Sequence, residues 1–227
     1  MISKNLAKTG GTAHIIAGVI FILVFIGLAM TPFEQITPDA DKFITSYSAN
    51  PLPLTAVCLL LILGGLVAFG SVVESTADLF EEKNEGLTRF GKNIGKLSVA
   101  VTSIGFSAFL LTTIAMVESY NIEGAATKSI ITAIWNPLLF FKWISLFAFG
   151  TLGLWVVIVG LLVFTKGVLP KSYVIICALK SGGFWICLAG FMLENILMLK
   201  IGAVIGILIG GSIYHFWQGI FLRHLAK

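Results

Sequence analysis

Six long apolar runs constrain the fold of this chain more than any other feature of its sequence. Each run carries little or no charge and, at about 20 residues, is long enough as a helix to cross roughly 30 Å of hydrocarbon. Membrane β-barrels instead show short segments of alternating polarity. We therefore expect an all-α membrane bundle, one domain over residues 1–227, with spans at Ala13–Met30, Leu52–Val73, Leu97–Val117, Trp143–Phe164, Ser172–Leu193 and Ile201–Leu222.

The composition places these runs in a membrane rather than in a soluble core. Hydrophobic residues make up 57% of the 227 residues and charged residues 11%, and the mean hydropathy is +0.99. Soluble domains carry about 25% charged residues, so we expect a multi-pass protein of the cell membrane in contact with the lipid bilayer. No pattern for signal-peptide cleavage follows the first run, and we expect that run to remain as a helix.

Basic residues in the connections predict the orientation. If successive spans alternate in direction, ten Lys and Arg residues fall at one end and four at the other. Positively charged connections stay in the cytoplasm, so both termini are predicted to be cytoplasmic. This asymmetry and contact with anionic lipid account for the net charge of +4, and nucleic-acid binding has no support. The ten are Lys4, Lys8, Lys83, Arg89, Lys92, Lys96, Lys166, Lys171, Arg223 and Lys227, and the four are Lys42, Lys128, Lys142 and Lys200.

Three glycines four residues apart predict a packing face on the last span. Gly202, Gly206 and Gly210 fall on one side of a helix and allow a neighbouring backbone to approach closely. Membrane helices use such faces because lipid provides no hydrophobic drive for their association. We expect a contact within the bundle, and we keep an interface between subunits as the alternative.

An intramembrane lysine predicts a ligand or proton site. Lys180 falls about 12 Å into the fifth span, where an unpartnered charge costs at least ~2.5 kcal/mol. No acidic residue falls at a comparable depth. The alternative is a lysine that snorkels or bonds to carbonyl and hydroxyl groups. Tyr214, His215 and Gln218 form a polar stripe on the last span at helical spacing, and we assign them with Lys180 to the candidate site.

Charged and polar residues near the ends of the spans suggest a second candidate region. If the last four spans are neighbours, these residues form an ion-paired outer vestibule. The alternative is that each only solvates the end of its helix, which is the commoner role of exposed charges. The residues are Glu118, Lys142, Glu194, Asn195 and Lys200.

Two histidines raise the question of a haem b with axial ligands from two spans. His14 and His215 both belong to the cytoplasmic half, but counted from the ends of their runs they lie about 3 Å and 10 Å deep. Because axial ligands need matched depths, we expect interfacial or hydrogen-bonded histidines and no cofactor or metal. Haem b stays a minor alternative.

Motifs of soluble enzymes are absent from the sequence. There is no P-loop, dinucleotide-binding glycine pattern, H-E-x-x-H or nucleophile elbow, so we predict no catalytic residue and lean against an enzyme. Cys58, Cys177 and Cys187 fall inside apolar runs without metal-ligand spacing, as packing residues do.

Several short segments carry a resemblance to a known family. They are "EEKNEGL" after the second span, "GVLPKSY" between the fourth and fifth, and "FWQGIFLRHL" at the end of the last, together with a long loop after the first. With these the chain resembles an uncharacterised family of six-span prokaryotic membrane proteins. The resemblance implies the fold and brings no activity.

Three functions compete at this point. The first is a non-catalytic scaffold, accessory subunit or homo-oligomer that uses the glycine face and the long outer loops for contacts. The second is a small carrier or channel for a proton, an anion or an amphipathic ligand, and the third is a haem-bearing electron carrier. The shortage of intramembrane carboxylates favours the first, because coupled carriers generally use them.

Overall fold

The structure is a computed structural model that describes residues 2–36, 39–82, 84–122 and 124–227, and Lys83 therefore lies outside it. The described residues form helices and no strand. The first half contains α1 (Lys4–Met30), η1 (Phe33–Ile36), α2 (Ala40–Ala49), α3 (Leu52–Val67), η2 (Ala68–Val72), α4 (Val73–Asp78) and α5 (Glu85–Ile122). The second half contains α6 (Ala125–Ile134), α7 (Pro137–Ser145), η3 (Leu146–Thr151), α8 (Leu152–Lys166), α9 (Tyr173–Met192), α10 (Ile196–Gly202), η4 (Ala203–Gly211) and α11 (Ser212–Leu225).

The prediction of an all-α membrane bundle is confirmed, because six helical stretches in the described part of the chain are long and apolar enough to cross a membrane. Five of them extend beyond the predicted apolar runs, whereas Tyr173–Met192 is one residue shorter than its run at each end. The helix ends are set by capping and not by the limit of the hydrocarbon. Ser3 caps α1 by accepting a hydrogen bond from the Leu6 amide, so α1 begins nine residues before Ala13. Asn195 caps α10 in the same way.

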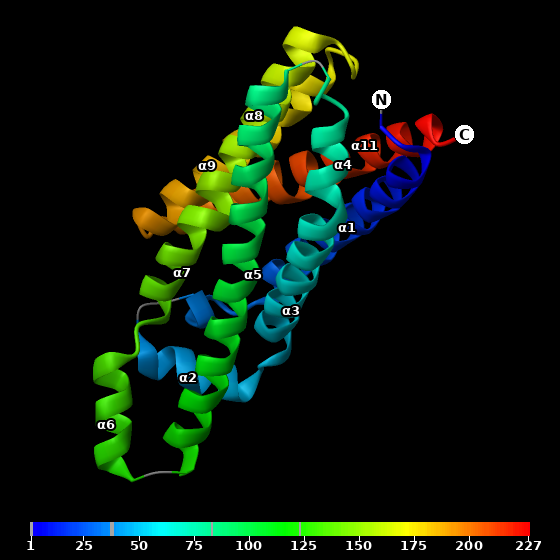
Figure 1. Cartoon of the computed structure of the whole chain (residues 1–227). Helices are drawn as coiled ribbons and strands as arrows, with labels where there is room; N and C mark the ends of the chain where they lie inside the picture. The colour runs from blue at the N-terminus through cyan, green and yellow to red at the C-terminus, as the bar shows by residue number, and fades with distance from the viewer. Residues whose placement is uncertain (1, 37–38, 83, 123) are drawn as a thin grey trace.

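The six spans form a closed ring in chain order (Figure 1). The span α1 contacts α3, α3 contacts α5, α5 contacts α8, and α8 contacts α9. The ring closes because α9 packs on α10 and η4, while α11 packs along α1. The first and last spans are thus neighbours, and residues about 200 positions apart meet between them.

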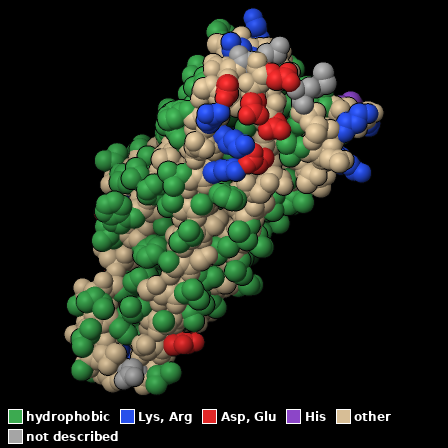
Figure 2. Space-filling view, in the orientation of Figure 1, with side chains coloured by type: hydrophobic (Ala, Val, Ile, Leu, Met, Phe, Trp, Pro, Cys, Tyr) green, Lys and Arg blue, Asp and Glu red, His purple; other side chains and the backbone are tan. Residues whose placement is uncertain are grey.

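The two ends of the bundle differ in their connections and charge. Both termini and the α4–α5 and α8–α9 connections lie at one end, which we call the terminal end, whereas α2 and α6 lie at the opposite, far end (Figure 1). Figure 2 shows most of the visible charged side chains gathered at the terminal end, above a surface rich in hydrophobic side chains. This distribution is the one expected of a protein whose sides face lipid.

The glycine face of the last span packs on α9. A Cβ atom on Gly206 would lie 2.7 Å from the carbonyl carbon of Gly183, and one on Gly210 would lie 2.6 Å from the Cα of Lys180. A Cβ atom on Gly202 would lie 2.6 Å from the Cys187 amide nitrogen. The face is therefore occupied by α9 within one chain, and it fixes the backbone of Lys180 against the last span.

Candidate functional site

A cavity of about 820 Å³ lies inside the ring, with walls from all six spans. It extends from Lys180 and His215 in the interior to Thr31, Phe33 and Lys200 near the far end. Most of the lining side chains are aliphatic or aromatic. The volume is within the range of roughly 300–1,000 Å³ that is typical of small-molecule sites.

Three of the spans widen into π-helical turns where they border this cavity. These are η2, η3 and η4, which contribute Ala68, Ala148, Ala203 and Ile207 to its wall. In a π-turn the hydrogen bond joins residues five positions apart, one more than in an α-helix, and such turns occur often at functional sites.

Lys180 lies at the interior limit of the cavity and is buried, with 1% of its surface exposed. Its Nζ atom lies 2.8 Å from Nε2 of His215 and 3.9 Å from the centre of the Tyr214 ring. The rings of Phe21 and Phe184 follow at 4.9 and 5.7 Å. Among the described residues no carboxylate lies within 4 Å of the amine, so the lysine neither snorkels nor forms an ion pair.

His14 and His215 contact each other through their Nδ1 atoms, which lie 3.1 Å apart. Nε2 of His14 lies 3.2 Å from Oγ1 of Thr76. The unequal depths predicted for the two histidines were wrong, because the apolar runs do not mark the helix ends. His14 lies ten residues after the start of α1 and His215 ten residues before the end of α11, or about 15 Å in both helices.

This arrangement does not fit a haem between the two histidines. The Nδ1 atoms bond to each other directly, and both Nε2 atoms already have protein partners. An iron with axial imidazoles would need a nitrogen of each ring free to face the porphyrin. The described part of the chain also holds no group of three or more His, Cys, Asp or Glu side chains arranged for a metal.

Gln218 joins the histidine pair to a further buried tyrosine. Its Nε2 atom donates to Oγ1 of Thr76 at 2.8 Å, and its Oε1 atom accepts from the Tyr173 hydroxyl at 2.9 Å. The Thr76 hydroxyl donates to the carbonyl oxygen of Val72 at 2.7 Å. Tyr173, Thr76 and Gln218 are all buried. The result is a continuous polar network across α1, α4, α9 and α11.

The structure brings the four predicted site residues into this one network. Lys180 contacts Tyr214 and His215 directly, and Gln218 reaches His14 through Thr76. Sequence reasoning missed Thr76 and Tyr173. Tyr173 had a weak signal, because it precedes Lys180 by seven residues and so falls on the same face of α9. Thr76 had none, since a threonine in a membrane helix commonly bonds only to its own backbone.

The predicted vestibule residues do not form one cluster. Lys142 and Glu194 pair at 2.7 Å, while Asn195 caps α10. Lys200 is exposed on the cavity wall at the far end. Glu118 is exposed on α5 and, within the described ranges, has no ion pair. Of the five, only Lys142 and Glu194 are joined by an ion pair.

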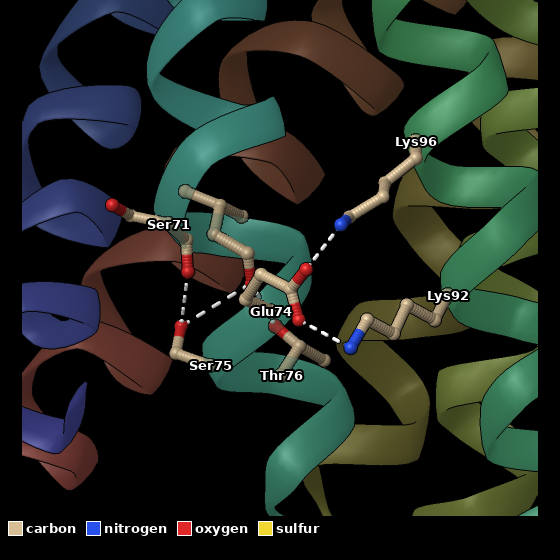
Figure 3. A network of polar contacts seen from close by, with 7 residues as sticks. Ser71, Glu74, Ser75, Thr76, Lys92 and Lys96 are labelled. Atoms are coloured by element: carbon tan, nitrogen blue, oxygen red, sulfur yellow. Dashed lines mark hydrogen bonds and ion pairs between the residues drawn. The ribbon is translucent and has the colours of Figure 1, made fainter.

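A second polar cluster lies near the terminal end. Glu74 of α4 pairs with Lys92 and Lys96 of α5, and Figure 3 shows its carboxylate between the two amines, close to Thr76 on the same helix. A small cavity of about 10 Å³, about the volume that one water molecule needs, lies beside it. Its wall includes Thr76, Lys92 and Thr88.

Searches of known protein families, of curated proteins and of solved structures found no match to the chain. The resemblance to the six-span prokaryotic family stays a prediction.

Proposed function

We propose that the protein binds a single-chain amphiphile with an acidic head, a long-chain carboxylic acid, inside the ring of helices. The observation that carries the proposal is the apolar cavity of about 820 Å³ that ends on a buried lysine. An acidic amphiphile has an apolar chain and an anionic head. The chain matches the apolar wall along most of the cavity, and the head matches the cationic group at its interior limit.

The lysine supports an acidic head because it has hydrogen-bond capacity to spare. A charged amine has three donors, and His215 uses one of them. The aromatic rings of Tyr214, Phe21 and Phe184 favour a cation at this position but accept no conventional hydrogen bond. A carboxylate head reaching the cavity limit would provide the missing counter-charge, which a buried cation requires.

The remainder of the cavity supports an apolar chain. Its wall consists mainly of Leu, Ile, Val, Ala and Phe side chains, and it reaches the far end of the bundle beside Lys200. Burial of each methylene in such a wall is worth about 0.8 kcal/mol, so a chain of ten or more carbons would contribute most of the affinity. The head would then set the specificity.

The other two functions lose support from the same contacts. The scaffold hypothesis relied on the glycine face and the long outer loops. The glycine face is buried against α9, which leaves the loops as the surface for a partner. The haem hypothesis needed free imidazole nitrogens, and those of His14 and His215 are all engaged. The amphiphile proposal requires neither a free glycine face nor a free imidazole nitrogen.

Binding of a radiolabelled long-chain carboxylic acid and of the alcohol of equal length to the detergent-purified protein tests the proposal. Lys180→Met should weaken binding of the acid by about tenfold or more, as expected for a lost charge-assisted hydrogen bond, and leave binding of the alcohol unchanged. Lys171→Met, at the exposed α8–α9 connection, is the matched control. Ala203→Trp should fill the cavity and weaken both ligands. Equal binding of the acid to the wild type and to Lys180→Met would overturn the proposal.

A further inference from the structure

We infer that His215 and His14 form a proton relay, which connects Lys180 in the cavity with the Glu74 cluster at the terminal end. The chain of contacts is unbroken from Nζ of Lys180 to Oγ1 of Thr76, with steps of 2.8, 3.1 and 3.2 Å. All four groups are buried. A proton path of this kind is an activity beyond ligand binding.

The hydrogen bonds at Thr76 fix the direction of the chain. The single hydroxyl proton of Thr76 is donated to Val72, and one lone pair accepts from Gln218. The remaining lone pair must accept from His14, which therefore carries a proton on Nε2. A neutral His14 then accepts at Nδ1, so His215 donates from Nδ1 and accepts from Lys180 at Nε2. Every donor in the chain points from the cavity toward the terminal end.

The transfer of one proton along the relay consists of one step between each pair of neighbouring groups. Nζ of Lys180 gives a proton to Nε2 of His215 as Nδ1 of His215 gives one to Nδ1 of His14. His14 gives its Nε2 proton to Oγ1 of Thr76 as the hydroxyl proton of Thr76 turns from the Val72 carbonyl to a water in the small cavity, and no electron moves. Each imidazole then carries its proton on the opposite nitrogen. Rotation of both rings, return of the Thr76 hydroxyl to Val72 and uptake of a proton by Lys180 from the large cavity restore the starting state. Imidazole suits this role because it binds a proton at one nitrogen while releasing one from the other.

The water-sized cavity provides the continuation beyond Thr76. The hydroxyl of Thr88 faces no hydrogen-bond partner among the described residues although it is buried, and Thr88 and Thr76 share the wall of this cavity. A buried hydroxyl without a partner favours an ordered water, which would also stand beside Lys92. Lys92 pairs with Glu74, whose side chain is 26% exposed, so the path reaches solvent there (Figure 3).

The surroundings of the histidine pair contain few groups that could divert a proton. Lys180 of α9 and Thr76 of α4 are the hydrogen-bonded neighbours, and Tyr214 of α11 and Phe21 of α1 cover the rings. Tyr173 and Cys177 face the same region from α9. Within the described residues no carboxylate pairs with either imidazole. Of the relay groups, Lys180 and His215 line the large cavity, whereas His14 and Thr76 lie outside its wall.

The relay does not depend on the proposed amphiphile. The chain of contacts is complete in the ligand-free protein, so proton flux and acid binding can fail separately. Absence of flux through the wild-type protein, with acid binding intact, would overturn the relay alone. Loss of acid binding with flux intact would overturn only the proposed function.

Proton flux into vesicles tests the inference. The full-length protein is reconstituted with a pH-sensitive dye inside, and a potassium diffusion potential drives protons inward. Flux should exceed that of protein-free vesicles, and His14→Asn and His215→Asn should return it to that baseline, because an amide keeps a polar group without shuttling protons. His224→Asn, at the exposed tail, is the matched control and should retain full flux.

Two results would overturn the relay. One is wild-type flux no greater than that of protein-free vesicles, which needs no variant and so does not depend on folding. The other is flux that persists in His14→Asn at the wild-type rate. Equal thermal unfolding of His14→Asn and the wild type, measured in the same lipid, shows that a loss of flux is not a loss of fold.

Discussion

His14 of α1 and His215 of α11 lie 201 residues apart in the chain, yet their Nδ1 atoms are 3.1 Å apart in the interior of the bundle. The contact joins the first and last spans at the point where the ring closes. Because Lys180 bonds to one imidazole and Thr76 to the other, four elements meet at this pair. The stability of the ring and the properties of the cavity therefore depend on the same side chains.

The histidine pair should show strong energetic coupling. His14→Leu leaves the Nδ1 donor of His215 buried without a partner, which costs about 1–3 kcal/mol, and the reverse holds for His215→Leu. The double variant removes both groups and should cost less than the sum of the single variants. We expect a coupling free energy of about 0.5–3 kcal/mol from a double-mutant cycle of unfolding in detergent. Additive costs would mean that the two imidazoles do not interact.

Two adjacent glycines of α9 should respond in opposite ways to alanine. The Cβ atom of Gly183→Ala would overlap the backbone of Gly206, whereas a Cβ atom on Gly182 has no atom within 4 Å. Overpacking at Gly183 should lower the unfolding free energy by about 1–3 kcal/mol. Gly182→Ala should be neutral or stabilising by up to about 1 kcal/mol, since alanine favours a helix. Thermal melts of the two variants check this, and equal shifts would contradict the seam between α9 and η4.

The number of spans and their general position could be predicted from the sequence, because a bilayer demands about 20 apolar residues from every helix that crosses it. The helix ends could not, since they depend on single capping residues such as Ser3 and Asn195. Depths counted from Ala13 placed His14 shallower than His215, so the sequence did not predict that the two histidines meet.

The sequence could indicate single residues of the candidate site but not the contacts between them. Depth singled out Lys180, and helical spacing singled out Tyr214, His215 and Gln218, because each of these properties can be seen within a single helix. Thr76 and His14 join them through contacts between helices, which the sequence does not encode locally. The cavity could not be predicted either, since its wall is formed by side chains from all six spans and its volume depends on how they pack together.

The ion pairs of Glu74 and of Glu194 should contribute unequally to the free energy of unfolding. Glu74 holds two lysines and its side chain is 26% exposed, whereas Glu194 holds only Lys142 and is 53% exposed. Glu194→Gln should therefore change the unfolding free energy by no more than about 1 kcal/mol, as is usual for exposed pairs. Glu74→Gln should cost more, about 1.5–3 kcal/mol, because it weakens charged hydrogen bonds to two partners. Denaturation of the two variants in one detergent compares them, and an equal cost would refute the distinction.

The orientation in the membrane can be tested with introduced cysteines. The basic connections predict that the terminal end faces the cytoplasm. Lys42→Cys and Ser129→Cys, at the far end, should react with an impermeant maleimide on intact cells, while Lys171→Cys should react only after lysis. The native cysteines are buried and give little background. If only Lys171→Cys were labelled on intact cells, the terminal end would face outward, which contradicts the predicted orientation.

The central claim is that the cavity holds an acidic amphiphile with its head on Lys180, and a density map of the protein with a brominated long-chain carboxylic acid tests it most directly. We expect the carboxylate within hydrogen-bond distance of Nζ, about 2.7–3.2 Å, and the brominated chain along the cavity toward Lys200. A map that resolves the side chains of Lys180 and His215 but shows an empty cavity, or a carboxylate at Lys200 with the chain pointing inward, would contradict the claim.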